Sequence, residues 1–276
     1  MRNRHIWILI ALVVGSVSIR AQWINHPSPG TPRTKDGKPN LLAAAPRAAE
    51  GKPDLSGVWI AESAPREELI RFLGPTAMNL LGEASPSRYF MNALGDYKPE
   101  EIVLKPAAAE VFRQRGATFG KDMPSTHCLP LGIPLMDVAV FPHKIIQAPG
   151  LILVLYEELT TFRQIYTDGR KLPENPEPTA LGYSVGTWEG DALVVNVSGF
   201  SDQGWLDAFG HPHSDAMKVT ERFHRRDFGH MDVQVTVDDP KTYSRPFTYK
   251  FTKQLMPDTD LIDSFCSNEK DRVHLR

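Results

Sequence analysis

The sequence predicts a mainly β protein in which short strands form one antiparallel barrel of about eight to ten strands. Short runs of apolar, aromatic and β-branched residues recur along the chain, separated by turns rich in Gly, Pro and Asp. Most neighbouring runs are only a few residues apart, which is typical of antiparallel pairs. The 23 prolines among 276 residues disfavour long helices. Closure would remove exposed sheet edges, and a two-sheet sandwich is the alternative.

Two hairpins are the clearest elements. Tyr183–Trp188 and Ala192–Val197 flank one short turn, and Lys218–Phe223 and Met231–Val237 flank another. Each turn contains a glycine where the chain must reverse. Further strands are expected at Leu55–Ile60, Lys144–Gln147, Leu151–Glu158, Phe162–Thr167, Arg245–Leu255 and Leu261–Cys266.

Residues 65–142 are expected to form a helical and loop insertion over one end of the barrel. Glu67–Leu73 and Lys98–Arg115 contain helix formers, and Pro106 interrupts the second segment, which predicts short helices. Asp122–Pro142 is apolar and punctuated by prolines. We therefore expect this loop to be buried and to form a wall of a cavity.

The N-terminus has the composition of a targeting segment. A basic start and the apolar run Ile6–Val14 predict a signal peptide at residues 1–21. Cleavage is expected after Ser18 or Ala21, and an uncleaved anchor is the alternative. The protein is thus expected to be periplasmic or secreted, with no stable membrane span after signal removal.

The remaining chain divides into an arm and one domain. Residues 22–54 are rich in Pro and Gly, which predicts an extended linker or arm, and residues 55–276 form a single β-barrel domain. The net charge of -2, without long charge blocks, does not indicate a nucleic-acid partner. Cys128 and Cys266 are the two cysteines, and in an oxidising compartment a disulfide is expected. The chain-entropy model gives such a bridge about 4–5 kcal/mol; two buried thiols are the alternative.

His211, His213 and Glu221 form a candidate metal site. Two imidazoles and a carboxylate are a common ligand set for zinc, iron or manganese. The pattern resembles that of metal-binding cupins, but the gap to the glutamate is longer and Pro212 makes the histidine segment a turn. The alternative is a loop whose histidines bond to backbone groups.

Two predicted strands carry charges on alternating faces. In the first, Arg163 and Tyr166 lie on opposite faces, so one of them is expected to face the interior. In the second, Glu221 and Arg222 alternate in the same way, and the inward group needs a partner. Asp168-Gly169-Arg170 is interpreted as a turn with locally paired charges.

Other catalytic signatures are sparse. His127 or His143, with Asp137 as carboxylate partner, is a candidate general base. The commonest hydrolase and nucleotide-binding motifs are absent from the sequence, which removes those classes without excluding an enzyme.

Gly57-Val58-Trp59 on the first strand resembles the start of lipocalin-like (calycin) barrels. In that family the tryptophan closes the barrel end against a basic residue from a late strand, which implies a role for Arg245 or Lys250. A longer resemblance, to uncharacterised secreted proteins of soil bacteria such as acidobacteria, implies secretion and this fold but no activity. Its blocks are Cys128-Leu129-Pro130-Leu131-Gly132, Asp168-Gly169-Arg170, Gly186-Thr187-Trp188-Glu189-Gly190-Asp191, Thr220-Glu221-Arg222-Phe223 and Cys266-Ser267-Asn268-Glu269.

The leading hypothesis is a secreted barrel that binds an apolar or aromatic small molecule in an internal cavity. Apolar walls would come from Trp59, Trp188, Phe200, Trp205 and the loop 128–141, and polar contacts from Arg163, Tyr166, His213, Glu221 and Arg222. The alternative is a hydrolase, lyase or isomerase that uses His213 and Glu221 in the same cavity, with or without a metal. An envelope interaction module is a third possibility.

Overall fold

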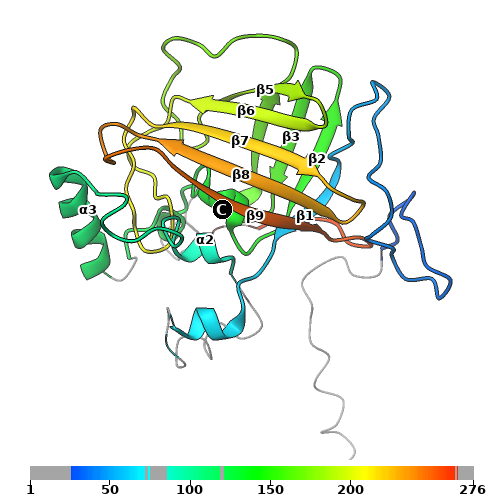
Figure 1. Ribbon diagram of the computed structural model, residues 1–276, viewed down its shortest axis with the longest axis horizontal. Helices are drawn as coiled ribbons and strands as arrows, with labels where there is room; N and C mark the ends of the chain where they lie inside the picture. Colours follow the sequence, from blue (N-terminus) through cyan, green and yellow to red (C-terminus); the bar gives the residue numbers. More distant parts are fainter. Residues whose placement is uncertain (1–25, 72–73, 75–85, 119–120, 265, 267–276) are drawn as a thin grey trace, which may run out of the picture.

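The computed structural model describes residues 26–71, 74, 86–118, 121–264 and 266, and it confirms a mainly β fold built on a closed nine-stranded barrel (Figure 1). The strands are β1 (Gly57–Ala61), β2 (His143–Ala148), β3 (Leu151–Tyr156), β4 (Thr161–Tyr166), β5 (Tyr183–Glu189), β6 (Ala192–Ser198), β7 (Lys218–Arg225), β8 (His230–Asp238) and β9 (Phe247–Leu255). Each strand pairs with its sequence neighbours, and β1 pairs with β9 to close the barrel.

The barrel is mixed and not wholly antiparallel. β4 and β5 run parallel over a short register, Ile165 opposite Ser184 and Tyr166 opposite Val185. The connection between them spans residues 167–182, long enough to return along the barrel before the next strand begins. The other eight pairs are antiparallel.

The predicted tenth strand at Leu261–Cys266 does not form: residues 261–264 and 266 carry no strand assignment. Pairing of β1 with β9 leaves no free edge for another strand. The segment instead bonds to the β3–β4 turn, where the Ile262 N–H donates to Glu157 and the Ser264 N–H donates to Thr160.

The insertion between β1 and β2 supplies the short helices. Residues 66–71 are helical, followed by α2 (Arg88–Met91), α3 (Pro106–Ala117) and the 3-10 turns η1 (Pro124–His127) and η2 (Leu135–Val138). Pro106 does not interrupt a helix but begins α3, because the first helical position needs no N–H donor. α3 projects from the side of the barrel (Figure 1) and is anchored by Phe112 and Arg115, which stack on His211 and Trp205.

Residues 26–54 run over the barrel as an extended arm. Arg33 pairs with Asp258 and Arg47 with Asp191, and between these pairs the Phe228 and Gly229 N–H groups donate to arm carbonyls. The predicted signal peptide lies outside the described residues. In the described part of the chain, no helix is both long and apolar enough to cross a membrane.

Trp59 and Arg225 close one end of the barrel. Trp59 is fully buried, its Nε1 donates to the Leu55 carbonyl at 2.9 Å, and the Arg225 guanidinium lies 4.9 Å from the ring centroid. The basic residue over the tryptophan is therefore Arg225, not Arg245 or Lys250. Arg225 donates to four backbone carbonyls, those of Asp54, Ser56, Asp227 and Phe228.

Candidate ligand-binding site

The barrel interior holds a network of buried charges. Arg163 of β4 donates to Glu221 of β7 and, at 3.4 Å, to Asp137 of η2. Lys253 of β9 donates to Asp137 at 2.5 Å and lies 2.9 Å from Nε2 of His143. All five side chains are buried. η2 thus brings one carboxylate into the barrel, and β4, β7 and β9 supply the other charged groups.

Burial and pairing set the protonation states of this network. Burial raises the pKa of Glu221 to about 7, with Arg163 opposing the shift. Burial acts in the same direction on Asp137, but Lys253 and Arg163 outweigh it and lower its pKa. Burial and the nearby Lys253 place the pKa of His143 well below its usual value, so its Nε2 is an acceptor for the lysine. The network is charge-balanced when Glu221 is ionised.

This interior has little room for a ligand. The cavity beside Asp137, Arg163 and Lys253 measures about 10 Å³. That is roughly the space that one water molecule needs. The rest of its lining consists of Leu55, Ile145, Ile152, Val154, Ile165, Leu193 and Phe223. Glu221, a candidate catalytic residue, is fully buried and held by Arg163.

His211 and His213 are not assembled with Glu221 into a metal centre. His211 pairs with Asp207 at 2.5 Å, and Nδ1 of His213 lies 3.3 Å from the Ser214 carbonyl. Among the described residues, no cluster of three or more His, Cys, Asp or Glu side chains is arranged to hold a metal ion. Both histidines are buried, and a methyl group added at Gly204 would overlap the His213 ring. The alternative, a loop whose histidines bond to backbone groups, describes His213, whereas His211 bonds to the Asp207 side chain.

The other predicted ligand contacts are dispersed. Arg222 faces outward and pairs with Glu189 at 2.6 Å. Tyr166 also lies outside the barrel, stacked on Tyr183. Trp205 is buried beneath Arg115. Trp188 is half-buried against the core, Phe200 is fully buried, and Asp168 and Arg170 form the predicted local pair.

A pocket of about 450 Å³ lies outside the barrel interior, beside the disulfide. Its apolar walls are Phe90, Met123, Leu131, Ala139, Val140, Phe141 and Leu159. Small polar residues, Ser125, Thr126 and Ser264, lie among them. The size and the mainly apolar lining are typical of small-molecule sites. The loop 128–141, expected to wall a cavity, supplies four of the lining residues, starting with Leu131.

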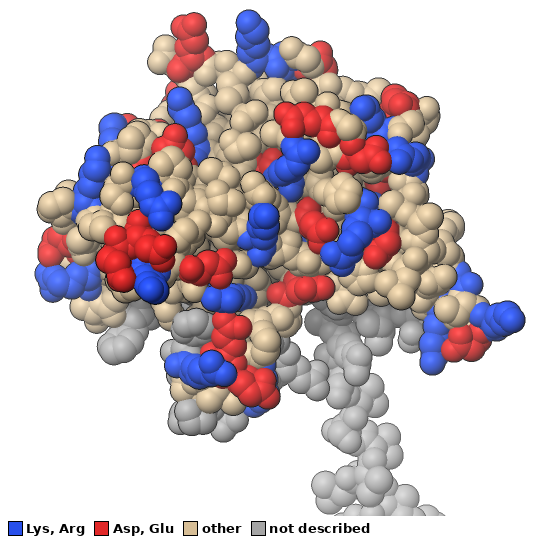
Figure 2. Space-filling model, in the orientation of Figure 1, with Lys and Arg blue, Asp and Glu red and all other residues tan. Residues whose placement is uncertain are grey.

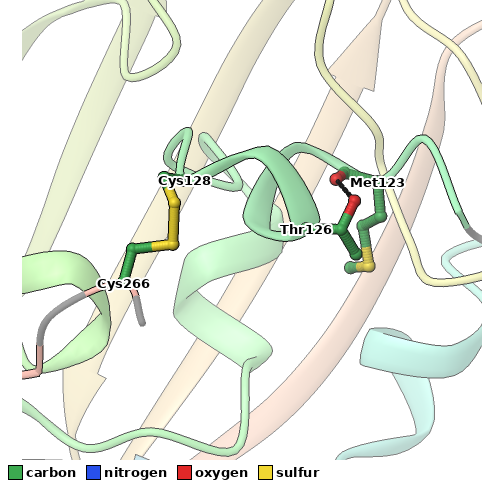
Figure 3. Close-up of a disulfide and its surroundings, with 4 residues drawn as sticks. All are labelled: Met123, Thr126, Cys128 and Cys266. Atoms are coloured by element: carbon green, nitrogen blue, oxygen red, sulfur yellow. Dashed lines mark hydrogen bonds between the residues drawn. A yellow bond between two sulfur atoms is a disulfide. The ribbon is translucent and has the colours of Figure 1, made fainter. Parts of the chain in front are cut away.

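The predicted disulfide between Cys128 and Cys266 is present and ties the C-terminal segment to η1 (Figure 3). Met123 and Thr126 lie close to it, and the Thr126 hydroxyl donates to the Met123 carbonyl at 2.7 Å. A second link joins Thr160 to Ser264 through two 3.3 Å hydrogen bonds. The two links together fix the C-terminal wall of the pocket.

Glu158 is the ionisable side chain among the described residues that line this pocket. It is 5 % exposed, and its buried Oε2 has no hydrogen-bond partner in the described part of the chain. Burial raises its pKa to about 7. The two residues after it, Leu159 and Thr160, have φ values of 51° and 49°. Such conformations are costly for residues other than glycine and concentrate at functional sites.

A second, more polar groove of about 710 Å³ separates the arm from the Trp59 end of the barrel. Its basic side chains are already engaged, since Lys144 pairs with Asp260 and Arg225 donates to backbone carbonyls. Over the face shown in Figure 2, acidic and basic side chains are interspersed. The pocket beside the disulfide is therefore the better candidate site.

Comparison with known proteins does not add a function. No protein-family model matches the chain, and no curated protein is significantly similar to it. The geometry of the site carries the functional argument alone.

Glu158 has no distinctive signal in the sequence. It is the last residue of the predicted strand Leu151–Glu158. Its position next to Glu157 and two residues before Thr160 is typical of a polar turn. It lines the pocket together with Ser264 and Cys266, and its neighbours Glu157 and Thr160 bond to that C-terminal segment, more than 100 residues away in the chain. This long-range arrangement cannot be read from the local sequence around Glu158.

Proposed function

We propose that this protein is a secreted or periplasmic binding protein for an apolar or aromatic small molecule, which it holds in the pocket beside the disulfide. The observation that carries the proposal is the pocket itself, about 450 Å³ with seven apolar residues and one carboxyl group in its lining. The barrel interior, where the sequence alone suggests the ligand, is occupied by the Arg163 network.

Localisation and kinship are parts of the same proposal. The basic and apolar start of the sequence and the Cys128–Cys266 disulfide support export to an oxidising compartment. The stacking of Arg225 on Trp59, two residues after Gly57, supports the resemblance to lipocalin-like barrels. An enzyme using His213 and Glu221 has less support, because both side chains are buried and separately bonded.

The proposal is tested by filling the pocket. N-phenyl-1-naphthylamine, an uncharged aromatic probe whose fluorescence rises in apolar sites, is titrated into the purified protein. Ser125 lines the pocket and is half-buried, so Ser125→Phe places a ring in it. Ser201 is also half-buried but lies outside the lining, which makes Ser201→Phe the matched control.

We expect saturable one-to-one binding by the wild type and by Ser201→Phe. Ser125→Phe should bind at least about tenfold more weakly, because the ring occupies the volume that the probe needs. Circular dichroism establishes that both variants fold. No saturable binding, or equal binding by both variants, would overturn the proposed site.

A further inference from the structure

The pocket is lined by Glu158, one of whose carboxyl oxygens has no hydrogen-bond partner in the described part of the chain. Glu158 is nine-tenths or more buried, and its Oε2 has neither a hydrogen-bond donor nor water access. A buried polar atom without a partner destabilises the folded state, and native structures rarely retain one without a use. The lining brings no lysine, arginine or histidine of the described chain to compensate an ionised carboxylate.

The surroundings of Glu158 identify the missing group. The Thr126 hydroxyl already donates to the backbone carbonyls of Lys121 and Met123, so its proton is engaged. Phe90 and Phe141 supply aromatic rings, whose faces attract cations. An anionic ligand would meet a like charge, whereas an ammonium group would supply both the charge and the N–H donors that the carboxylate lacks.

This inference rests on the proposed function. We propose that the pocket binds an organic cation, which has an apolar or aromatic body and an ammonium group whose N–H donates to Glu158. Leu131, Ala139 and Val140 would cover the apolar body. The left-handed backbone at Leu159 and Thr160, together with the Thr160–Ser264 bonds, holds the glutamate in place before the ligand arrives.

Nearby titratable groups do not compete with this role. Burial is the cause of the raised pKa of Glu158, with no charged neighbour contributing. Glu157, the adjacent carboxyl, does not line the pocket and accepts the Ile262 N–H. The other charged or titratable side chains on the elements that form the pocket include Arg88, Tyr89, Lys121, Asp122, His127, Asp137 and Asp263, all outside the described lining.

The test compares three probes with one body and different heads: 4-phenylbutylamine, 4-phenylbutanol and 4-phenylbutyrate. Each is titrated calorimetrically into wild type, Glu158→Gln and Glu157→Gln at pH 6 and pH 8. Glutamine keeps the shape of the side chain and removes its charge. Glu157→Gln is the matched control, because it makes the same change one residue away and keeps an acceptor for Ile262.

The amine should bind at pH 8 at least about tenfold more tightly than the alcohol, and the carboxylate should bind most weakly. Because the ammonium pairs with ionised Glu158, whose pKa is about 7, amine affinity should rise about tenfold from pH 6 to pH 8. Glu158→Gln should lose this pH dependence and the preference for the amine. Its affinity for the alcohol should stay at the wild-type value. Glu157→Gln should behave as wild type.

Two failures have different meanings. Binding of the alcohol or carboxylate as tightly as the amine, or an unchanged amine preference in Glu158→Gln, would overturn the cation inference and leave the pocket as a neutral apolar site. Absence of binding by all three probes would overturn the proposed function and this inference together.

Discussion

Arg163 and Glu221 form an ion pair across the barrel interior, with both side chains at most 2 % exposed. They lie on β4 and β7, which are not neighbours in the sheet, so the pair crosses the barrel core and does not join adjacent strands. A buried pair of this kind adds little net stability over apolar packing. Removal of only one member of the pair nevertheless destabilises the fold, because the other charge is then left unpaired in an interior that solvates it poorly.

Loss of the guanidinium should therefore destabilise the protein strongly. In Arg163→Met, Glu221 loses its donor and Asp137 loses one of its donors, and we expect the free energy of unfolding to fall by about 3–5 kcal/mol. Arg222→Met removes an exposed pair with Glu189 and should cost about 1 kcal/mol or less. Urea unfolding followed by tryptophan fluorescence measures both. Equal losses in the two variants would show that the interior pair is not a structural element.

Glu158 should make stability depend on pH. Its pKa is about 7 in the folded protein against an ordinary value of 4.5, so the folded state binds the proton more tightly. Stability should consequently fall as pH rises from 4.5 through 7. Glu158→Gln removes this penalty, and its advantage over wild type should grow by about 2–3 kcal/mol between pH 5 and pH 8.

Chemical unfolding at the two pH values checks this expectation. The exposed Glu177 serves for comparison, and Glu177→Gln should follow the wild-type curve. If the difference between Glu158→Gln and wild type is the same at both pH values, the glutamate is not held in a desolvated site.

The Arg225 contacts predict that lysine cannot replace this arginine. The guanidinium reaches four backbone carbonyls and stacks on Trp59, whereas one ammonium group has neither the fork geometry nor the planar face. Arg225→Lys should lower the free energy of unfolding by about 2–3 kcal/mol. The neighbouring Arg226 is half-exposed and pairs with Asp232. Arg226→Lys should therefore change the free energy of unfolding by about 0.5 kcal/mol or less. An unchanged free energy of unfolding in Arg225→Lys would contradict this description of the barrel end.

Removal of the disulfide should affect stability and binding together. Cys128→Ser/Cys266→Ser should cost up to about 5 kcal/mol, because the bridge closes a loop with a sequence separation of 138 residues. Affinity for N-phenyl-1-naphthylamine should fall as well, since Ser264 and Cys266 line the pocket. Thermal unfolding and probe titration measure the two effects. Each single variant should match the double variant, and a stable, fully binding double variant would contradict this role.

Much of the fold was predictable because it rests on local signals. Turn glycines and alternating residues locate the two hairpins between Tyr183 and Val237 to within about two residues. The direction of β5 was not predictable, since a loop of sixteen residues, 167–182, permits either direction. The strand predicted at Leu261–Cys266 from its residue types was wrong, because the pairing of β1 with β9 leaves no free sheet edge to which this segment could add.

The site was less predictable because its contacts are long-range. Alternation on β7 restricts the inward charge to Glu221 or Arg222, but the choice depends on Arg163, 58 residues earlier in the chain. The apolar loop 128–141 was a sound indication of a cavity wall. Its partner, Glu158, becomes a candidate only when the C-terminal segment is in place.

The most direct measurement is a crystal structure of the protein with 4-phenylbutylamine bound at pH 8. The account predicts the phenyl ring between Leu131 and Phe141, with the amine nitrogen within hydrogen-bond distance of the Glu158 carboxylate. A probe bound in the groove at the Trp59 end, or a pocket that stays empty while the probe is bound elsewhere, would contradict it.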